Sequence, residues 1–84
     1  MKTYKDFKAF ERRITKSCDW DDYFRVDGKL YRIYEYGGGN MMKLDYCYVY
    51  FLNRRTKTLL YVKYDLNPYK FKSFEVIEDA ILWR

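Results

Sequence analysis

The chain has 84 residues, of which 23% are aromatic and 35% charged, and its formal net charge is +5. A chain this short forms one domain, residues 1–84, with a modest core, because it buries only about 60–65% of the surface that its unfolded form exposes. It contains no histidine, so the commonest general base and the commonest zinc ligand are both excluded.

The positive charge favours an anionic partner, most commonly nucleic acid, although a charge of this size also suits plain solubility. The two cysteines, Cys18 and Cys47, lie far apart and form no C-x-x-C motif. The first residues, "MKTYKDFKAF", contain no apolar run typical of a signal peptide, and no stretch reaches the ~20 apolar residues that span a bilayer. We therefore expect a cytoplasmic protein with reduced thiols and no membrane partner.

Residues 3–17 have the pattern of an amphipathic helix, in which Thr3 and Asp6 resemble a capping box. The apolar stripe consists of Tyr4, Phe7, Phe10 and Ile14. A second, basic stripe consists of Lys5, Lys8, Arg12 and Lys16. The basic stripe is a candidate electrostatic footprint for a nucleic acid, although most charged helix faces are simply solvated.

An acidic segment follows, with Asp19, Asp21 and Asp22 around Trp20. Carboxylates bind hard cations, but this segment lacks the spacing and the glycine of an EF-hand loop. We therefore expect no metal site and interpret the segment as a turn that ends the helix.

Residues 23–36 are expected to form a hairpin around Asp27-Gly28, because this dipeptide favours a type I′ turn. The predicted pairs are Val26–Lys29, Arg25–Leu30, Phe24–Tyr31 and Tyr23–Arg32. Alternation places on one face, expected to be core, Phe24, Val26, Tyr31 and Ile33. The other face carries Tyr23, Arg25, Leu30, Arg32, Tyr34 and Tyr36.

This second face interleaves arginine with tyrosine. Aromatic rings on a sheet can stack exposed bases, while arginines hold phosphates or stack in turn. Arg25, Arg32 and Tyr34 are therefore candidate nucleic-acid ligands. The alternative is that the first helix covers this face and that the tyrosines belong to the core.

The segment Gly37-Gly38-Gly39-Asn40 invites comparison with phosphate-binding loops, but Met41 and Met42 follow it and the next segment is a strand. A P-loop requires Lys and Ser or Thr and then a helix, and the dinucleotide fingerprint requires different glycine spacing. We interpret the segment as a flexible joint between two hairpins, whose backbone amides could still touch a phosphate.

A second hairpin is predicted from strands at roughly 42–52 and 58–65. Its first strand is apolar or aromatic on both faces, so it should be central in its sheet. Its loop, "NRRTK", places Arg54, Arg55 and Lys57 at one tip. Adjacent arginines can clamp a phosphate backbone, or they can keep a hydrophobic hairpin from aggregating.

Asn67-Pro68 predicts a turn that stops strand pairing. After it, residues 73–84 can form a helix that begins at Ser73, and a strand through "SFEVIE" is the rival interpretation. The expected fold class is α+β, with an N-terminal helix packed on an antiparallel sheet of two hairpins and a C-terminal helix or edge strand.

In size and style the chain resembles the small accessory proteins of T-even-type phages. The resemblance rests on the charged start "MKTYKDFKAFERR", on tyrosine-rich strands such as "DYCYVYF", and on the scarcity of Pro and His. Such proteins include a basic, RNA-binding inhibitor of a host toxin–antitoxin ribonuclease, and phage inhibitors of CRISPR nucleases are a similar class. The resemblance implies a role in counter-defence in the host cytoplasm, and it assigns no residue a role.

We expect a non-enzymatic binding protein without a cofactor, since no catalytic constellation is recognisable. RNA or single-stranded nucleic acid is the expected partner, with a host toxin or nuclease as a possible further one. The alternative is a protein-only inhibitor that docks on a host enzyme through its aromatic residues, which are also typical of protein hot spots. A small assembly component is a third possibility, and an exposed sheet edge would allow a homodimer.

Overall fold

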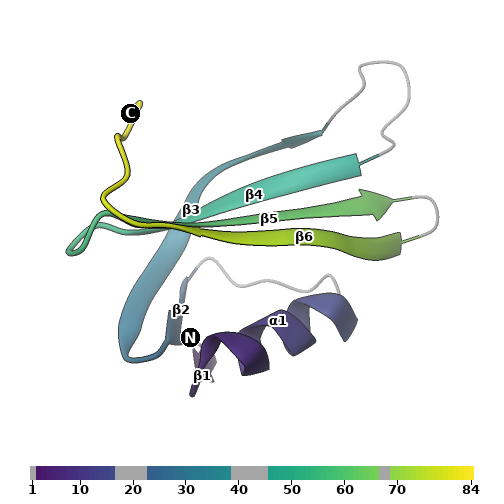
Figure 1. The fold of residues 1–84 in the computed structure, drawn as a ribbon, viewed down its shortest axis with the longest axis horizontal. Coiled ribbons are helices and arrows are strands. Elements are labelled where there is room, and N and C mark those ends of the chain that lie inside the picture. Colours follow the sequence, from purple (N-terminus) through teal and green to yellow (C-terminus); the bar gives the residue numbers. More distant parts are fainter. Residues whose placement is uncertain (1, 17–22, 39–45, 67–68) are drawn as a thin grey trace.

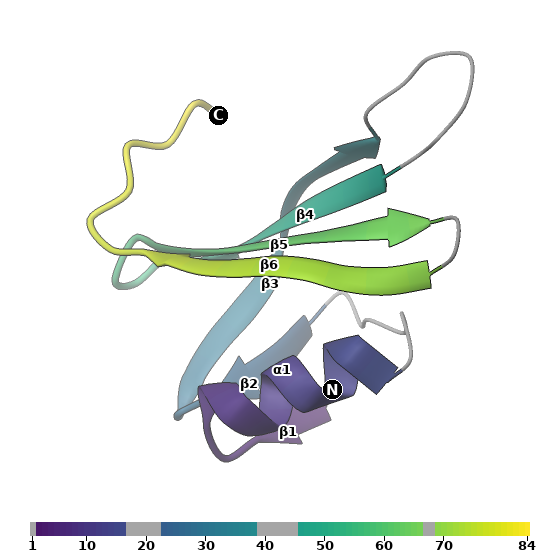
Figure 2. The same ribbon diagram turned by 45° about the vertical axis from the view of Figure 1, so that its right-hand side comes forward.

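The structure, a computed structural model, describes residues 2–16, 23–38, 46–66 and 69–84. Within these residues, six strands form one sheet in which spatial order follows sequence order, and one helix lies against one of its faces (Figure 1). The elements are β1 (Lys2–Tyr4), α1 (Phe7–Lys16), β2 (Tyr23–Val26), β3 (Lys29–Gly38), β4 (Tyr46–Asn53), β5 (Thr58–Leu66) and β6 (Tyr69–Ile77). Figure 2 shows how the sheet curls, so that β1 and β2 turn toward α1.

The predicted α+β fold with an antiparallel sheet is wrong, because the described chain is mostly β and its sheet is mixed. β1 and β2 are parallel, with Tyr4 opposite Val26, whereas all other neighbouring strands are antiparallel. The helix α1 is therefore the crossover that two parallel strands require, and the sheet continues beyond it. Curling is strongest along β3, where the register shifts between Ile33 and Glu35, as expected at a bulge.

The predicted start of the first helix is also wrong. Thr3 lies in β1, opposite Arg25, and does not cap a helix. The cap is Asp6, whose Oδ1 accepts a hydrogen bond from the backbone N–H of Ala9 at 2.8 Å. The apolar pattern assigned residues 3 and 4 to the first helical turn, but in the structure these residues pair with β2.

At the other end, the preferred helix from Ser73 is wrong, and the rival strand is what the structure contains. β6 pairs with β5 along its length, and Phe74 reaches the helix, with its ring 6.2 Å from that of Phe7. Backbone pairing with β5 and this ring contact therefore outweigh the helical pattern. Residues 79–84, called the tail below, form neither helix nor strand and fold back over the sheet (Figure 1).

Both predicted hairpins are confirmed, and the first has the predicted register at all four pairs. Asp27 and Gly28 have φ angles of 52° and 77°, which a type I′ turn requires. β4 lies between β3 and β5, as its two apolar faces predicted. The part of the predicted strand at 42–45 lies outside the described residues, as do Cys18 and the acidic segment at 19–22.

Gly37 and Gly38 belong to β3 rather than to a joint, while residues 39–40 lie outside the described part. The ring of Tyr48, on the neighbouring strand, crosses over Gly37. A Cβ at position 37 would lie 2.7 Å from the Tyr48 hydroxyl oxygen. A side chain at position 37 would therefore require the end of the Tyr48 side chain to shift.

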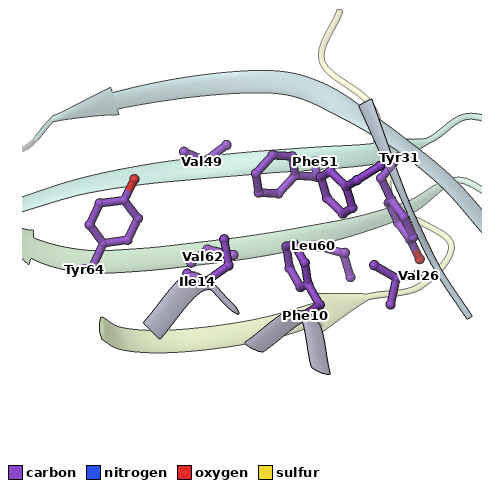
Figure 3. Close-up of a cluster of buried hydrophobic side chains, with 10 residues drawn as sticks. Phe10, Ile14, Val26, Tyr31, Val49, Phe51, Leu60, Val62 and Tyr64 are labelled. Carbon is purple, nitrogen blue, oxygen red and sulfur yellow. The ribbon is translucent and has the colours of Figure 1, made fainter. Parts of the chain in front are cut away.

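The core lies between α1 and the sheet, as predicted for the first face of the first hairpin (Figure 3). Phe10 stacks on Phe24 with ring centroids 4.7 Å apart, and Phe51 meets Phe24 edge-on at 4.8 Å. Large aromatic side chains compensate for the shortness of the chain, since each buries roughly 150–250 Å². No helix in the described part of the chain has the length and hydrophobicity needed to cross a membrane.

Candidate nucleic-acid interface

A groove of about 640 Å³ lies on the sheet face opposite α1, where β2 and β3 meet the turn between β4 and β5. It is lined by Tyr23, Arg25, Gly28, Lys29, Leu30, Arg32, Leu52, Asn53, Arg54, Arg55 and Thr56. Of the described residues that line the groove, five are cationic and none is acidic. The groove therefore concentrates positive charge far more than the net charge of +5 over the whole chain suggests.

The floor of the groove is apolar and partly open to solvent. Tyr23 and Leu30 keep 45% and 40% of their surface exposed, although both are large. The guanidinium carbon of Arg32 lies 5.5 Å from the centre of the Tyr23 ring. This cation–π contact holds a planar cation against an aromatic face, an arrangement that can accept another flat ring.

The turn that carries Arg54 and Arg55 is held by its own hydrogen bonds. Asn53, a buried polar residue, accepts a bond from the Thr56 backbone N–H at 2.9 Å through Oδ1. Lys57 has a φ of 54°, the left-handed conformation that closes the turn. Because the backbone is fixed in this way, the two exposed arginines line the groove from a defined position.

Four of the residues predicted from sequence thus lie together in the groove: Arg25, Arg32, Arg54 and Arg55. Lys57 belongs to the same turn but lies beside the tail, and its carbonyl oxygen accepts a bond from the Ala80 N–H at 2.9 Å. Lys29 was missed, because alternation assigns it to the face of Val26. Its position next to the Asp27-Gly28 turn was the one available signal, since side chains at the end of a hairpin are free to reach either face.

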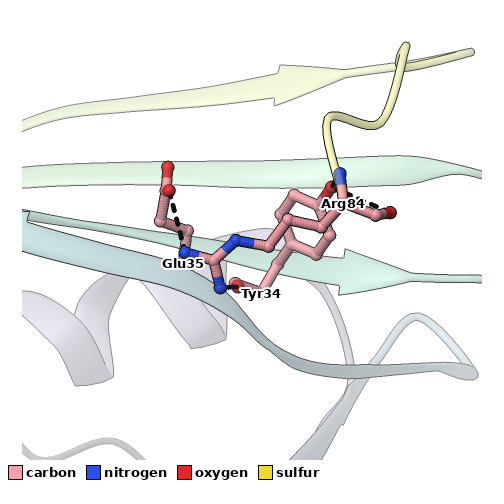
Figure 4. A network of polar contacts seen from close by, with 3 residues as sticks. All are labelled: Tyr34, Glu35 and Arg84. Atoms are coloured by element: carbon pink, nitrogen blue, oxygen red, sulfur yellow. Dashed lines mark hydrogen bonds and ion pairs between the residues drawn. The ribbon is translucent and has the colours of Figure 1, made fainter.

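Tyr34 is not available to a ligand, because the tail covers it. Its side chain is only 8% exposed, and its hydroxyl oxygen accepts a bond from the Arg84 backbone N–H at 2.6 Å. The Arg84 guanidinium donates to the Tyr34 carbonyl oxygen at 3.3 Å and to the Glu35 carboxylate at 3.2 Å (Figure 4). Tyr34 is therefore a structural residue, as the alternative interpretation of this face allowed. The element that covers it is the tail and not the first helix.

The basic helix stripe lies on the other side of the molecule. Lys5, Lys8 and Arg12 are exposed, whereas the apolar side of α1 packs on the core face of the sheet. The side chain of Lys16 lies outside the described part. The structure does not bring this stripe together with the groove.

Comparison with protein-family models, with curated protein sequences and with solved structures gave no match.

Proposed function

We propose that this protein binds RNA or single-stranded nucleic acid in the groove, without catalysing a reaction. The observation that carries the proposal is the groove's lining, which among the described residues has five cationic side chains and no carboxylate around an exposed tyrosine. Phosphates are held by arginine through paired, charge-assisted hydrogen bonds. Unpaired bases stack on tyrosine and on the plane of a guanidinium group.

Different residues of the groove suit these two tasks. Arg54 and Arg55 are exposed on a fixed turn, where they can contact successive phosphates. Tyr23 with Arg32 forms a flat surface that can stack an unpaired base. Given the resemblance in size and style to small phage accessory proteins, which include an inhibitor of a host ribonuclease, the setting that we propose is neutralisation of such an enzyme in the host cytoplasm.

The test compares two double variants that change the net charge equally on opposite faces. Arg54→Glu/Arg55→Glu alters the groove, and Lys5→Glu/Lys8→Glu alters the exposed helix side. For a labelled single-stranded RNA, we expect the groove variant to bind at least about tenfold more weakly, a difference of about 1.4 kcal/mol. Its salt dependence should also flatten, by about 0.7 in log–log slope for each phosphate that the variant no longer binds.

The helix variant is the matched control and should bind almost as well as the unmodified protein. Equal losses of affinity in both variants would mean that only net charge matters and would contradict a site in the groove. If the unmodified protein binds no nucleic acid, the proposal fails. Purification with a single host protein and no nucleic acid would then favour the protein-only inhibitor.

A further inference from the structure

The same sheet face carries a second group of aromatic residues beyond the tail. This tyrosine cluster consists of Tyr46, Tyr48, Tyr50 and Tyr61, on β4 and β5, and all four side chains are half-buried. The ring of Tyr50 lies 4.7 Å from that of Tyr61 and 5.9 Å from that of Tyr48. With Glu35 and Lys63, these rings line a shallow hollow of about 210 Å³.

Trp83 connects the tyrosine cluster with the region of the groove. Its ring meets Tyr50 edge-on at 5.1 Å and Tyr34 edge-on at 4.8 Å, yet 48% of the residue stays exposed. On the groove side, Leu52 both lines the groove and packs in the cluster that contains Ala80 of the tail. The tail therefore lies between the two surfaces and presents a tryptophan there.

The charges around the tyrosine cluster are mixed, and Lys63 is the cation that lines its hollow. The ammonium nitrogen of Lys63 lies 4.3 Å from the centre of the Tyr46 ring. The Glu35 carboxylate is paired with Arg84 at 3.2 Å, which offsets its charge. Among the described residues, Glu75 on the edge strand β6 and Asp65, the cross-strand partner of Tyr46, are further carboxylates near these rings, and Asp65 lies 3.9 Å from Lys72. The pKa values of Tyr50 and Tyr61 are raised mainly by burial, and Glu75 contributes to both.

We propose that Trp83 and the tyrosine cluster form a second, base-stacking subsite for the strand whose phosphates bind in the groove. This inference rests on the proposed function. Every base has a π-face, so such a subsite binds without strong sequence preference. Lys63 contacts the backbone there, as Arg54 and Arg55 do at the groove.

With two subsites, the affinity for an oligonucleotide should depend on whether it is long enough to reach both. Single-stranded binding folds cover about 4–16 nucleotides, so oligouridylates of about 4 and about 12 nucleotides separate one subsite from two. We expect Trp83→Ala and Lys63→Glu each to lower the ratio of 12-mer to 4-mer affinity at least about fivefold. Affinity for the 4-mer, held in the groove, should change little in either variant.

Tyr36→Ala is the matched control, because Tyr36 is 70% exposed and belongs to neither surface. The length ratio should be unchanged in this variant. A second readout uses Trp20→Phe, which leaves Trp83 as the only tryptophan of the chain. At saturation, the 12-mer should quench its fluorescence more strongly than the 4-mer does.

The outcomes separate the two proposals. If both oligonucleotides bind and the length ratio is the same in all variants, the second subsite is overturned while the proposed function stands. A Trp83 signal that responds equally to both lengths also counts against the subsite. If neither oligonucleotide binds, the proposed function itself fails, and a protein partner becomes the occupant to test.

Discussion

At the scale of single residues, the hydroxyl group of Tyr31 is buried without a hydrogen bond among the described residues. Its side chain is fully buried in the core, and its hydroxyl has no hydrogen-bond partner among the described residues (Figure 3). A buried hydroxyl in this state costs about 1–3 kcal/mol. Tyr34 provides the contrast, because its buried hydroxyl accepts a bond from the Arg84 N–H.

We therefore expect Tyr31→Phe to raise the free energy of unfolding by about 1 kcal/mol, since the ring stays and only the unpaired hydroxyl is removed. Tyr34→Phe should lower it by about 1 kcal/mol, because the Arg84 N–H then has no acceptor. Urea unfolding, followed by circular dichroism, measures both variants. Destabilisation of Tyr31→Phe would show that its hydroxyl has a partner.

Because Tyr31 is buried, we also expect the free energy of unfolding to fall at alkaline pH. Burial, with smaller contributions from Asp27 and Glu78, raises the pKa of Tyr31 to about 12. In the unfolded chain tyrosine ionises near pH 10, so above that pH the unfolded state binds fewer protons than the folded state. The contribution is constant below about pH 10, and stability falls toward about pH 12 by at most about 1.4 kcal/mol per pH unit.

Unfolding free energies measured between pH 9 and about pH 12 test this expectation. The Tyr31→Phe variant should lose less stability over that interval than the unmodified protein. The variant will still lose some, because the pKa values of Tyr50 and Tyr61 are also raised, mainly by burial. Parallel curves for the two proteins would contradict the assignment to Tyr31.

At the scale of elements, the first helix shows how a strand can displace a predicted cap. Both Thr3 and Asp6 are suitable capping residues, and the apolar stripe extends back to Tyr4. The structure uses Asp6, because residues 2–4 pair with β2 and cannot be helical. A strand of three residues is too short to have a recognisable alternation of its own.

The two interpretations predict opposite results for substitutions at these two positions. Asp6→Ala should lower the free energy of unfolding by about 1 kcal/mol, the usual effect of removing an N-cap. Asp6→Asn should restore most of the stability, because asparagine also accepts the Ala9 N–H. Thr3→Ala, the control in an exposed strand position, should change stability by less than about 0.5 kcal/mol. A larger effect at Thr3 than at Asp6 would support the capping box after all.

At the scale of the whole molecule, the two cationic surfaces lie on opposite faces of the sheet. Lys8 and Arg12 of α1, and Lys5 just before it, are exposed on the helix side, and the groove lies on the far face. One strand cannot contact both without passing around the edge of the sheet. For this reason, the charge-matched variants proposed above distinguish a local site from the effect of total charge.

The far face is itself divided by the tail. Ala80 and Leu82 pack near Tyr34, Leu52 and Leu59, while Ile81 remains 92% exposed. The tail covers the middle of the face and leaves a cationic groove on one side and the tyrosine cluster on the other. If residues 73–84 formed the predicted helix, no tail would divide this face in two.

The sequence by itself determined the two hairpins, the register of the first and the central place of β4, because turn residues and period-two alternation act between near neighbours. It also identified Arg25, Arg32, Arg54 and Arg55 as candidate ligands. Only the tertiary structure decided that these four lie in one groove, that Lys29 joins them and that Tyr34 is covered. Those outcomes depend on how β1, the curl of β3 and the tail pack against distant strands. Such long-range packing is decided by the whole chain, so no local pattern of residues reveals it.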